Sequence, residues 1–484
     1  MENQDEVRSR ILKQFLFALK DVNPNLRFLA LEGIQYLAGE ACSEEIAPIL
    51  NDNDRFVKWK AIQTCGILKI TKLFNELSKL LHSSDMNTRA YTALSLGHLG
   101  TADAGTKLSE AFVRETSPKV RQTIIRSFTY LKEHPQWETL AKASRDNDLG
   151  VRLDLAKLLG EMAPEQNALD ILLNLLEQES NNHVFATAIL ALGRFNRAAL
   201  IGYFQHSLLH QEPRIRANAI EAMSNLPFEC IEAGIRPYLN DPSNRVKANV
   251  ISIFFQNNQI NEMMTELNGL LFSDSRWERA SGAWLAGKFK VASVTEKLID
   301  LLADPEGVVA ERTAWALGCI RSVKTFPALL EAYKKANQWA LVHIVKAMGE
   351  TASQNEIPAL VFLLEKEKNP LLKSSFLEIL AKLKVTDSIN TALKMRSDLD
   401  ARVRTAAYML IGKLAPVQHS ETLFEGLKDT SVKIRAICAD LMIKAGDLRA
   451  LKTLSSILKD PDKLQRIQSY MTLKELALIT SDNG

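Results

Sequence analysis

Apolar residues recur along this chain every three or four positions, in runs that follow short polar turns. Such spacing gathers apolar side chains on one face of an α-helix. Residues 51–68, 302–320 and 427–443 show the full pattern, which is an acidic turn, a β-branched residue, often a basic residue, and then the apolar run. The pattern therefore predicts pairs of helices joined by polar turns, and an all-α chain.

The repeated unit has a nearly constant length, with steps of 31 to 33 residues. Such a period indicates one helical hairpin copied in series, so we expect a right-handed α-α superhelix, or solenoid, of about fifteen hairpins. We expect one continuous domain over residues 1–484, a kink near residues 177–185 where a step lengthens, and a short disordered tail at 480–484. One position after the turn is basic in twelve of fifteen units, and we take it as the anchor of each repeat. The anchors are Arg27, Lys58, Arg89, Arg121, Arg152, Phe185, Arg216, Lys247, Arg279, Ala310, Leu341, Lys373, Arg404, Arg435 and Arg466.

Two further positions recur relative to the anchor. Six residues before it the turn is acidic in eleven repeats, for example at Asp52 and Asp304. A carboxylate there accepts backbone N–H bonds, and we expect it to cap the helix that follows. Eight residues after the anchor glycine recurs, for example at Gly97 and Gly287. Because glycine inside a helix costs about 1 kcal/mol relative to alanine, its recurrence predicts a close approach of neighbouring helices.

The acidic turn, the basic anchor and the glycine resemble the HEAT repeat family, in particular the short bacterial variety found in phycobilin lyases. The resemblance covers nearly the whole chain and implies HEAT-type hairpins. In that family the turn Asp and the helix-start Arg of successive repeats form a ladder between layers, which implies a structural role for such pairs here. These pairs are Asp52 with Lys58, Asp398 with Arg404, and Asp429 with Arg435. The motif specifies a fold and is nearly silent about function.

The helical period also separates the two faces of the second helix in each hairpin. Positions −1, +3, +7 and +10 from the anchor are apolar and fall on one face, which we expect to be the core. Positions −2, +2, +5 and +9 lie opposite and should line the exposed, concave surface of a stacked solenoid. A functional site is therefore expected on this second face.

Four of the six tryptophans converge on that face in repeats nine to eleven, together with basic side chains. The predicted partner-binding residues are Trp277, Trp284, Lys288, Arg312, Trp315, Trp339, His343 and Lys346. Trp and Arg are enriched in binding hot spots, and the basic anchor is missing beside this cluster, at Ala310 and Leu341. The alternative is that these tryptophans fill gaps between helices.

A second candidate is an N-terminal groove, where Arg126 and Lys157 follow Tyr91, His98 and Tyr130. Ordinary solvated helix faces would explain that set equally well.

Composition narrows the class of protein. The net charge of +3 creates no global field that would favour nucleic acid or an anionic membrane. The five cysteines are far apart, without a Cys-x-x-Cys pair, and predict reduced thiols with no disulfide framework and no zinc site. The charged first ten residues and the absence of a long apolar stretch predict a cytoplasmic protein without a membrane span.

Motifs for catalysis and cofactors are absent from the sequence. His206 and His210 have the spacing of a two-histidine metal site, but no Glu follows the first and no third ligand is evident. No phosphate loop, nucleophile elbow or kinase signature occurs. We therefore predict no metal and no cofactor, and favour a non-enzymatic protein, although dispersed residues could still assemble an active site.

Three functions compete. The first is a scaffold or adaptor that holds a protein partner on the concave face, because repeat arrays offer long surfaces without an enclosed pocket. The second is a DNA-binding enzyme similar to the HEAT-like alkylpurine DNA glycosylases, which the Trp and Arg patch permits and the neutral net charge opposes. The third is a phycobilin lyase or chaperone-like protein, which the same short repeats suggest. The oligomeric state stays open.

Overall fold

The computed structural model describes residues 4–37, 42–131, 136–322, 324–335, 338–447, 449–450, 453, 467, 469 and 471–475. In this part of the chain every regular element is a helix. The chain divides into two compact units, and each is considered by itself. Unit 1 contains residues 1–236 and 458–484, and unit 2 contains residues 237–457.

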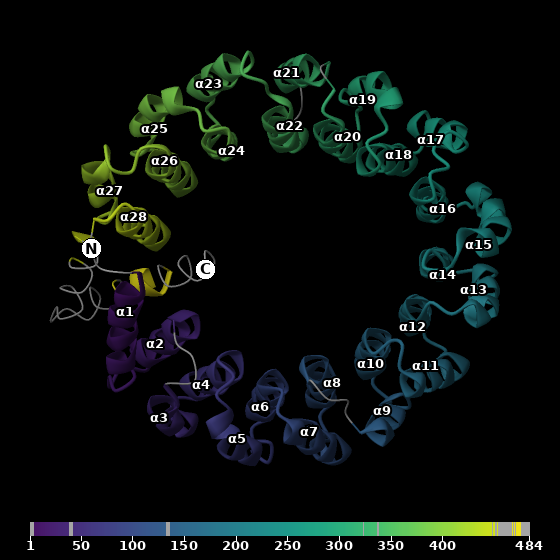
Figure 1. Cartoon of the computed structure of the whole chain (residues 1–484), viewed down its shortest axis with the longest axis horizontal. Coiled ribbons are helices and arrows are strands. Elements are labelled where there is room, and N and C mark those ends of the chain that lie inside the picture. The colour runs from purple at the N-terminus through teal and green to yellow at the C-terminus, as the bar shows by residue number, and fades with distance from the viewer. Residues whose placement is uncertain are drawn as a thin grey trace. The chain divides into compact units, whose positions relative to one another are not determined.

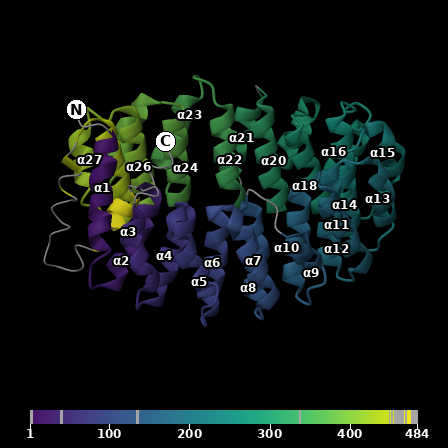
Figure 2. The ribbon, with the colours of Figure 1, turned by 60° about the horizontal axis from the view of Figure 1, so that its bottom comes forward.

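Each unit consists of two layers of helices (Figure 1). From α3 onward the odd-numbered helices form an outer layer and the even-numbered helices an inner layer on the concave side of each unit. Within each unit consecutive inner helices pack against one another, and most of them also pack against a neighbouring outer helix. Figure 2 shows the same helices standing side by side within each unit. The predicted fold class, an all-α stack of helical hairpins, is confirmed.

Unit 1 begins with α1 (Gln4–Ala18). Its inner helices are α2 (Pro24–Leu37), α4 (Arg55–Ile67), α6 (Met86–Leu99), α8 (Pro118–Ser127), α10 (Leu149–Glu161), α12 (Asn182–Leu192) and α14 (Pro213–Met223). Its outer helices are α3 (Ser43–Ile46), α5 (Phe74–Leu80), α7 (Ala102–Arg114), α9 (Trp137–Ala143), α11 (Gln166–Gln178), α13 (Ile201–Leu208) and α15 (Phe228–Ile235).

Unit 2 continues the same alternation. Its inner helices are α16 (Asn244–Gln256), α18 (Arg276–Lys288), α20 (Gly307–Ile320), α22 (Gln338–Thr351), α24 (Pro370–Lys382), α26 (Ala401–Leu414) and α28 (Val432–Lys444). Its outer helices are α17 (Met264–Leu271), α19 (Thr295–Leu301), α21 (Thr325–Lys335), α23 (Ile357–Lys366), α25 (Ile389–Met395) and α27 (Ser420–Gly426).

The core lies between the layers, on the face that the helical period predicts. In α4 the side chains of Val57, Ala61 and Cys65 are at most 1% exposed. Full burial of a large aliphatic side chain contributes about 1.5–3 kcal/mol, so every repeat adds its own share of stabilisation. The recurrent glycines also have the predicted role. A Cβ atom at Gly97 would lie 2.5 Å from the carbonyl oxygen of Ser127, the last residue of the next inner helix, and one at Gly287 would lie 2.7 Å from Cα of Ala316 in α20.

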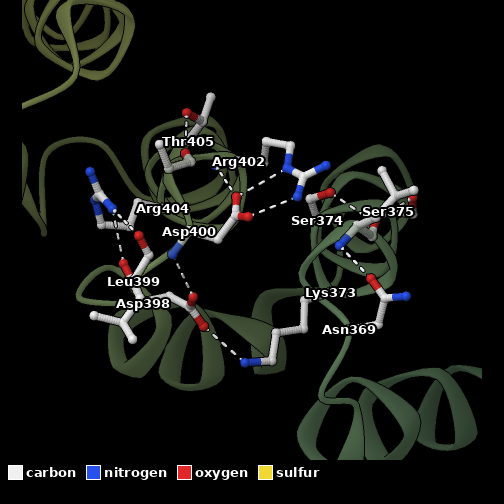
Figure 3. Close-up of polar contacts among 12 residues, drawn as sticks. Asn369, Lys373, Ser374, Ser375, Asp398, Leu399, Asp400, Arg402, Arg404 and Thr405 are labelled. Atoms are coloured by element: carbon white, nitrogen blue, oxygen red, sulfur yellow. Dashed lines mark hydrogen bonds and ion pairs between the residues drawn. The ribbon is translucent and has the colours of Figure 1, made fainter.

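A ladder of ion pairs joins successive repeats along the hairpin turns. Lys373 in α24 donates to the carboxylate of Asp398 at 2.8 Å, and Arg404 in α26 donates to the backbone oxygens of Asp398 and Leu399 at 3.0 and 3.1 Å (Figure 3). The remaining oxygen of Asp398 accepts the backbone N–H of Asp400 at 2.9 Å. The same arrangement recurs in both units, with bidentate pairs such as Arg27 with Asp52 and Arg279 with Asp304.

This ladder corrects two sequence predictions. The predicted pairs Asp52 with Lys58, Asp398 with Arg404 and Asp429 with Arg435 are wrong in their side-chain partner. Each carboxylate binds the anchor of the preceding repeat across the layer boundary, while Arg404 and Arg435 bind the carbonyls of their own turns. The turn acid also does not cap the helix. That role falls two residues later, for example to Asp54, whose carboxylate accepts the N–H groups of Phe56 and Val57.

The ladder pair is also missing in the three repeats whose anchor is not basic. Phe185 stacks on the ring of His210 at 6.2 Å between ring centroids. The hydroxyl of Tyr333 donates to Glu367. In the third case Ala310 occupies the anchor position, and Lys335 lies where the acid of the next turn would be. This last departure lies in unit 2 and leaves a cavity, described below.

In unit 1 the described part of the C-terminal segment contacts the first repeat. Residues 471–475 are helical, and Thr472 and Leu473 are fully buried. The ammonium of Lys474 lies 2.9 Å from the carboxylate of Glu32, which also pairs with Lys60 at 3.6 Å. The predicted tail at 480–484 lies outside the described residues. None of the helices among the described residues has the length and apolar character needed to cross a bilayer.

Candidate binding groove

Three inner helices of unit 2, α16, α18 and α20, border a groove of about 370 Å³. Small side chains at the position after the anchor, Ala248 and Ala280, leave space between the helices. The lining residues are Asn244, Arg245, Ala248, Asn249, Trp277, Ala280, Ser281, Trp284, Val308 and Arg312. Three of the eight predicted site residues, Trp277, Trp284 and Arg312, therefore meet in one groove, and what it binds stays a proposal.

The ladder and Asn244 hold α16 and α18, the helices that form two walls of the groove, in position. Arg279 donates to the backbone oxygens of Ser273 and Asp274, both at 2.9 Å, which holds the turn from which α18 begins. This turn brings Trp277 to the first residues of α18. Across the groove the side-chain amide of Asn244 donates to the hydroxyl of Ser281 at 2.8 Å and to the carbonyl of Trp277 at 3.3 Å. The first turns of α16 and α18 are thereby tied together.

Cations lie against both groove tryptophans. The guanidinium of Arg276 lies 5.0 Å from the ring centroid of Trp277 and donates to Glu306 at 3.0 Å. The ammonium of Lys288 lies 4.7 Å from the ring centroid of Trp284 and donates to Ser252 at 3.1 Å. Such contacts contribute about 0.5–1 kcal/mol when exposed and restrict the ring orientations. Trp277 nevertheless stays 54% exposed, so its ring is not a core filler.

The carboxylates that surround the groove are already paired. Glu278 accepts from Lys247 at 2.7 Å and from Ser273 at 2.5 Å, and these two hydrogen bonds lower the pKa of Glu278. Burial alone would raise the pKa of Asp304, but the hydrogen bond from Arg279 and its charge outweigh burial and hold that pKa below its usual range. Both groups are therefore anionic and neutralised at neutral pH.

Arg312 differs from these paired groups. Its side chain is exposed at the groove edge and forms no hydrogen bond or ion pair with any residue that the structure describes. Its neighbour Glu311 lies 3.4 Å from the Nε2 atom of His343 on α22. The Nδ1 atom of His343 is buried and has no partner among the described residues.

The other predicted residues extend the same face beyond the groove. Trp315 is 38% exposed and covers α18, since a Cβ atom at Gly287 would lie 2.7 Å from its ring. Lys346 is exposed on α22 and forms no bond with any described residue. Trp339 belongs to α22, but its side chain lies outside the described residues.

Sequence reasoning missed the polar lining of the groove, namely Asn244, Arg245, Asn249 and Ser281. Arg245, Asn249 and Ser281 occupy positions −2 and +2 of their repeats, which the register already placed on the exposed face. The register therefore predicts that these three side chains are exposed on this face, but the predicted site included only tryptophans and a few basic residues. Asn244 occupies position −3, which the face assignment did not include.

His210, one of the two histidines with metal-site spacing, has other contacts. The Nδ1 atom of His210 accepts the N–H of Glu212 at 3.0 Å, and its ring stacks on Phe185. Across the part of the chain that the structure describes, no group of three His, Cys, Asp or Glu side chains could hold a metal ion.

Comparison with known protein families identifies the type of repeat in two stretches of the chain. Residues 137–224 and 295–381 match the family model described as HEAT repeats, and the second stretch includes α20 and α22. The repeats in these two stretches are similar to HEAT repeats, whereas the phycobilin lyase variety stays a prediction. No curated protein matches the chain.

Several solved structures are similar in fold. The karyopherin Kap121p bound to the extreme C-terminus of the protein phosphatase Cdc14p is 13% identical, with a TM-score of 0.42 over 99% of this chain and 72% of that chain. Kap121p bound to Nup53p gives 13% identity and a TM-score of 0.42 over 100% and 72%. Importin beta in an ammonium sulfate condition gives 11% identity and a TM-score of 0.41 over 97% and 72%.

Proposed function

We propose that this chain of HEAT repeats is a non-catalytic scaffold that binds a protein partner on the inner face of unit 2, with the groove at its centre. The observation that carries the proposal is the unpaired Arg312 beside Trp277 and Trp284 in an open groove of about 370 Å³. Large aromatic residues and arginine are enriched in protein interfaces and among the residues that contribute most to binding.

The shape of the groove supports a peptide segment as its occupant. It is open and spans three adjacent inner helices, and its volume suits a few side chains of an extended chain. Trp315 and Lys346 continue the surface along α20 and α22, so a longer segment would find further contacts. A bound segment would cover the exposed part of Trp277 and gain apolar contact there.

No observation favours the other two functions. The DNA glycosylase and phycobilin lyase hypotheses stay predictions, since the groove shows neither a carboxylate free to act in catalysis nor a cysteine in its lining.

An unbiased peptide selection tests the proposal. Random peptides of about twelve residues, displayed on phage, are selected against the full chain, and selected peptides are titrated by fluorescence polarisation. We expect dissociation constants of about 1–100 μM, typical of small peptide interfaces. The variant Ser281→Tyr fills the groove with a ring and should weaken binding about tenfold or more.

The matched control is Thr405→Tyr, which adds the same ring on α26 outside the groove. It should leave binding unchanged. The scaffold proposal fails if no selected peptide binds, or if Ser281→Tyr leaves every selected peptide bound as tightly as before.

A further inference from the structure

We infer that the groove recognises an extended acidic segment, with one apolar residue on the tryptophans and two carboxylates on Arg312 and Lys346. This inference rests on the proposed function and names the chemistry of the partner. It depends on which charges the inner face leaves unpaired and on their spacing.

The inner helices α16, α18, α20 and α22 contain three carboxylates, and each has a basic partner. Glu278 pairs with Lys247, Glu311 lies against His343, and Glu350 pairs with both Arg321 and Lys382. On the same helices Arg312 and Lys346 have no partner among the described residues. The groove edge therefore offers donors and positive charge, and a complementary segment must supply acceptors and negative charge.

The aromatic part of the face also offers donors. The indole N–H groups of Trp277, Trp284 and Trp315 donate to no described side chain or backbone oxygen. An indole N–H group only donates hydrogen bonds, so it needs an acceptor, and a peptide carbonyl would supply one. One end of the site thus suits an apolar side chain packed on rings, with backbone carbonyls near the indoles.

The spacing of the helices sets the spacing of the partner residues. Neighbouring packed helices lie about 8–10 Å apart, and a segment in the extended polyproline II conformation advances about 3.1 Å per residue with every third side chain on one face. Arg312 and Lys346 lie on the adjacent inner helices α20 and α22, so their carboxylate partners should be about three residues apart. The groove centre lies about one helix before Arg312, which places the apolar residue about three positions before the first acid.

Nucleic acid fits this pattern less well. Binding to a phosphate backbone depends on several neutralised phosphates in a row. On these four helices Arg312 and Lys346 are unpaired, while Lys247 and Arg279 are engaged by Glu278 and Asp304. Two separated cations beside a groove that contains two tryptophan rings favour a peptide.

A designed peptide tests the inference on the full chain. The probe is a fluorescein-labelled peptide of about twelve residues in a Gly and Ser background, with Leu followed by Glu three and six positions later. We expect the peptide with both Glu replaced by Gln to bind about tenfold more weakly or worse, because two charge-assisted contacts are lost. A third peptide with Lys at both positions should bind more weakly still.

The double variant Arg312→Glu with Lys346→Glu should reverse the order and prefer the Lys peptide. Its matched control, Lys413→Glu with Lys433→Glu, makes the same charge change at exposed lysines of α26 and α28 and should keep the original order. An oligothymidine of similar length should not compete with the Glu peptide, and effective competition would assign the site to nucleic acid instead.

Failure of this inference can be told from failure of the scaffold proposal. If the Glu and Gln peptides bind equally and both are lost in Ser281→Tyr, the groove binds peptide without selecting acid, and the inference is overturned. If the selected phage peptides do not respond to Ser281→Tyr, the scaffold proposal itself falls.

Discussion

Two regions of the inner helices contain similar aromatic and basic residues, but the polar groups of these residues are paired in one region and unpaired in the other. The first lies in unit 1, where Trp59 on α4 contacts Tyr91 on α6 with ring centroids 5.8 Å apart. The indole of Trp59 donates to Asp85 at 3.0 Å and to Thr88 at 3.1 Å. The second is the groove of unit 2, where the indoles of Trp277 and Trp284 have no acceptor among the described residues.

The basic residues differ in the same way. In unit 1 the second sequence candidate, Arg126 and Lys157, converges on the carboxylate of Asp154, which also accepts from Gln122 at 2.8 Å. The side chain of Asp154 is only 5% exposed and pairs with both cations, although the side chains of Arg126 and Lys157 stay 58% and 55% exposed. Arg312 and Lys346 in unit 2 lack such an acid. Aromatic and basic residues are therefore candidates for a binding surface only where the chain leaves them unpaired.

The largest expected effect separates the two aromatic pairs by binding. Replacing Trp277 and Trp284 with Ala should weaken binding of the Leu and Glu peptide about 30-fold or more, because truncation of tryptophans at the centre of an interface costs about 2 kcal/mol or more in binding free energy. Replacing Trp59 and Tyr91 with Ala should leave the affinity within about twofold. Fluorescence polarisation measures both, and equal losses in the two variants would show that the pairing of indoles does not distinguish the regions.

The second prediction compares the basic residues by stability. Asp154→Asn removes the charge that Arg126, Lys157 and Gln122 share, and should lower the free energy of unfolding of unit 1 by about 1–2 kcal/mol. Arg312→Gln removes a cation that forms no hydrogen bond or ion pair with a described residue, and should change stability by less than about 0.5 kcal/mol. Urea denaturation followed by circular dichroism distinguishes them. A large loss for Arg312→Gln would mean that its guanidinium supports the fold.

These contrasts mark the limit of sequence reasoning. The repeat period predicted the hairpins, and the helical period predicted the buried face, because both depend on local spacing. The ladder partners were wrong, since Asp52 and Lys58 are close in sequence while the carboxylate reaches back to Arg27 across the layer boundary. The unpaired state of Arg312 could not be predicted, because it depends on which carboxylates of neighbouring helices lie within reach.

The third prediction concerns the missing ladder pair near the groove. Ala310 and Lys335 replace the usual Arg and acid, and a cavity of about 500 Å³ lies there, with Leu302, Ala332 and Ala340 in its lining. Introducing Ala310→Arg together with Lys335→Asp should stabilise unit 2 by about 0.5–1 kcal/mol, because the new pair fills the cavity and is partly buried. Thermal unfolding measures the gain.

Its control is Ala310→Arg alone, which places a guanidinium near Lys335 without an acid at the ladder position and should stabilise less, although Glu331 pairs with Lys335 at 2.9 Å in the same cavity. Peptide binding should stay unchanged in the double variant, since the ladder lies along the turns and the groove on the opposite side of α20. Loss of peptide binding on restoring the pair would show that the cavity and the groove form one site.

The smallest expected effect is a local titration that only the unit 1 region should show. Burial alone would raise the pKa of Asp85, but hydrogen bonds from Thr88 and from the indole of Trp59 outweigh it and lower the pKa. A carboxyl with a depressed folded-state pKa stabilises fully above its unfolded value of about 3.9, and this contribution is lost as the pH falls through the lower folded value.

With 5-fluorotryptophan, the fluorine resonance of Trp59 should shift as the pH falls below about 4, before unfolding. The resonances of Trp277 and Trp284 should not move in that range, because no carboxylate accepts from them. In Asp85→Asn, which retains an acceptor oxygen for the helix cap, the Trp59 resonance should lose its pH dependence. A groove tryptophan that titrates with Trp59 would reveal a carboxylate partner there and remove the difference between the two regions.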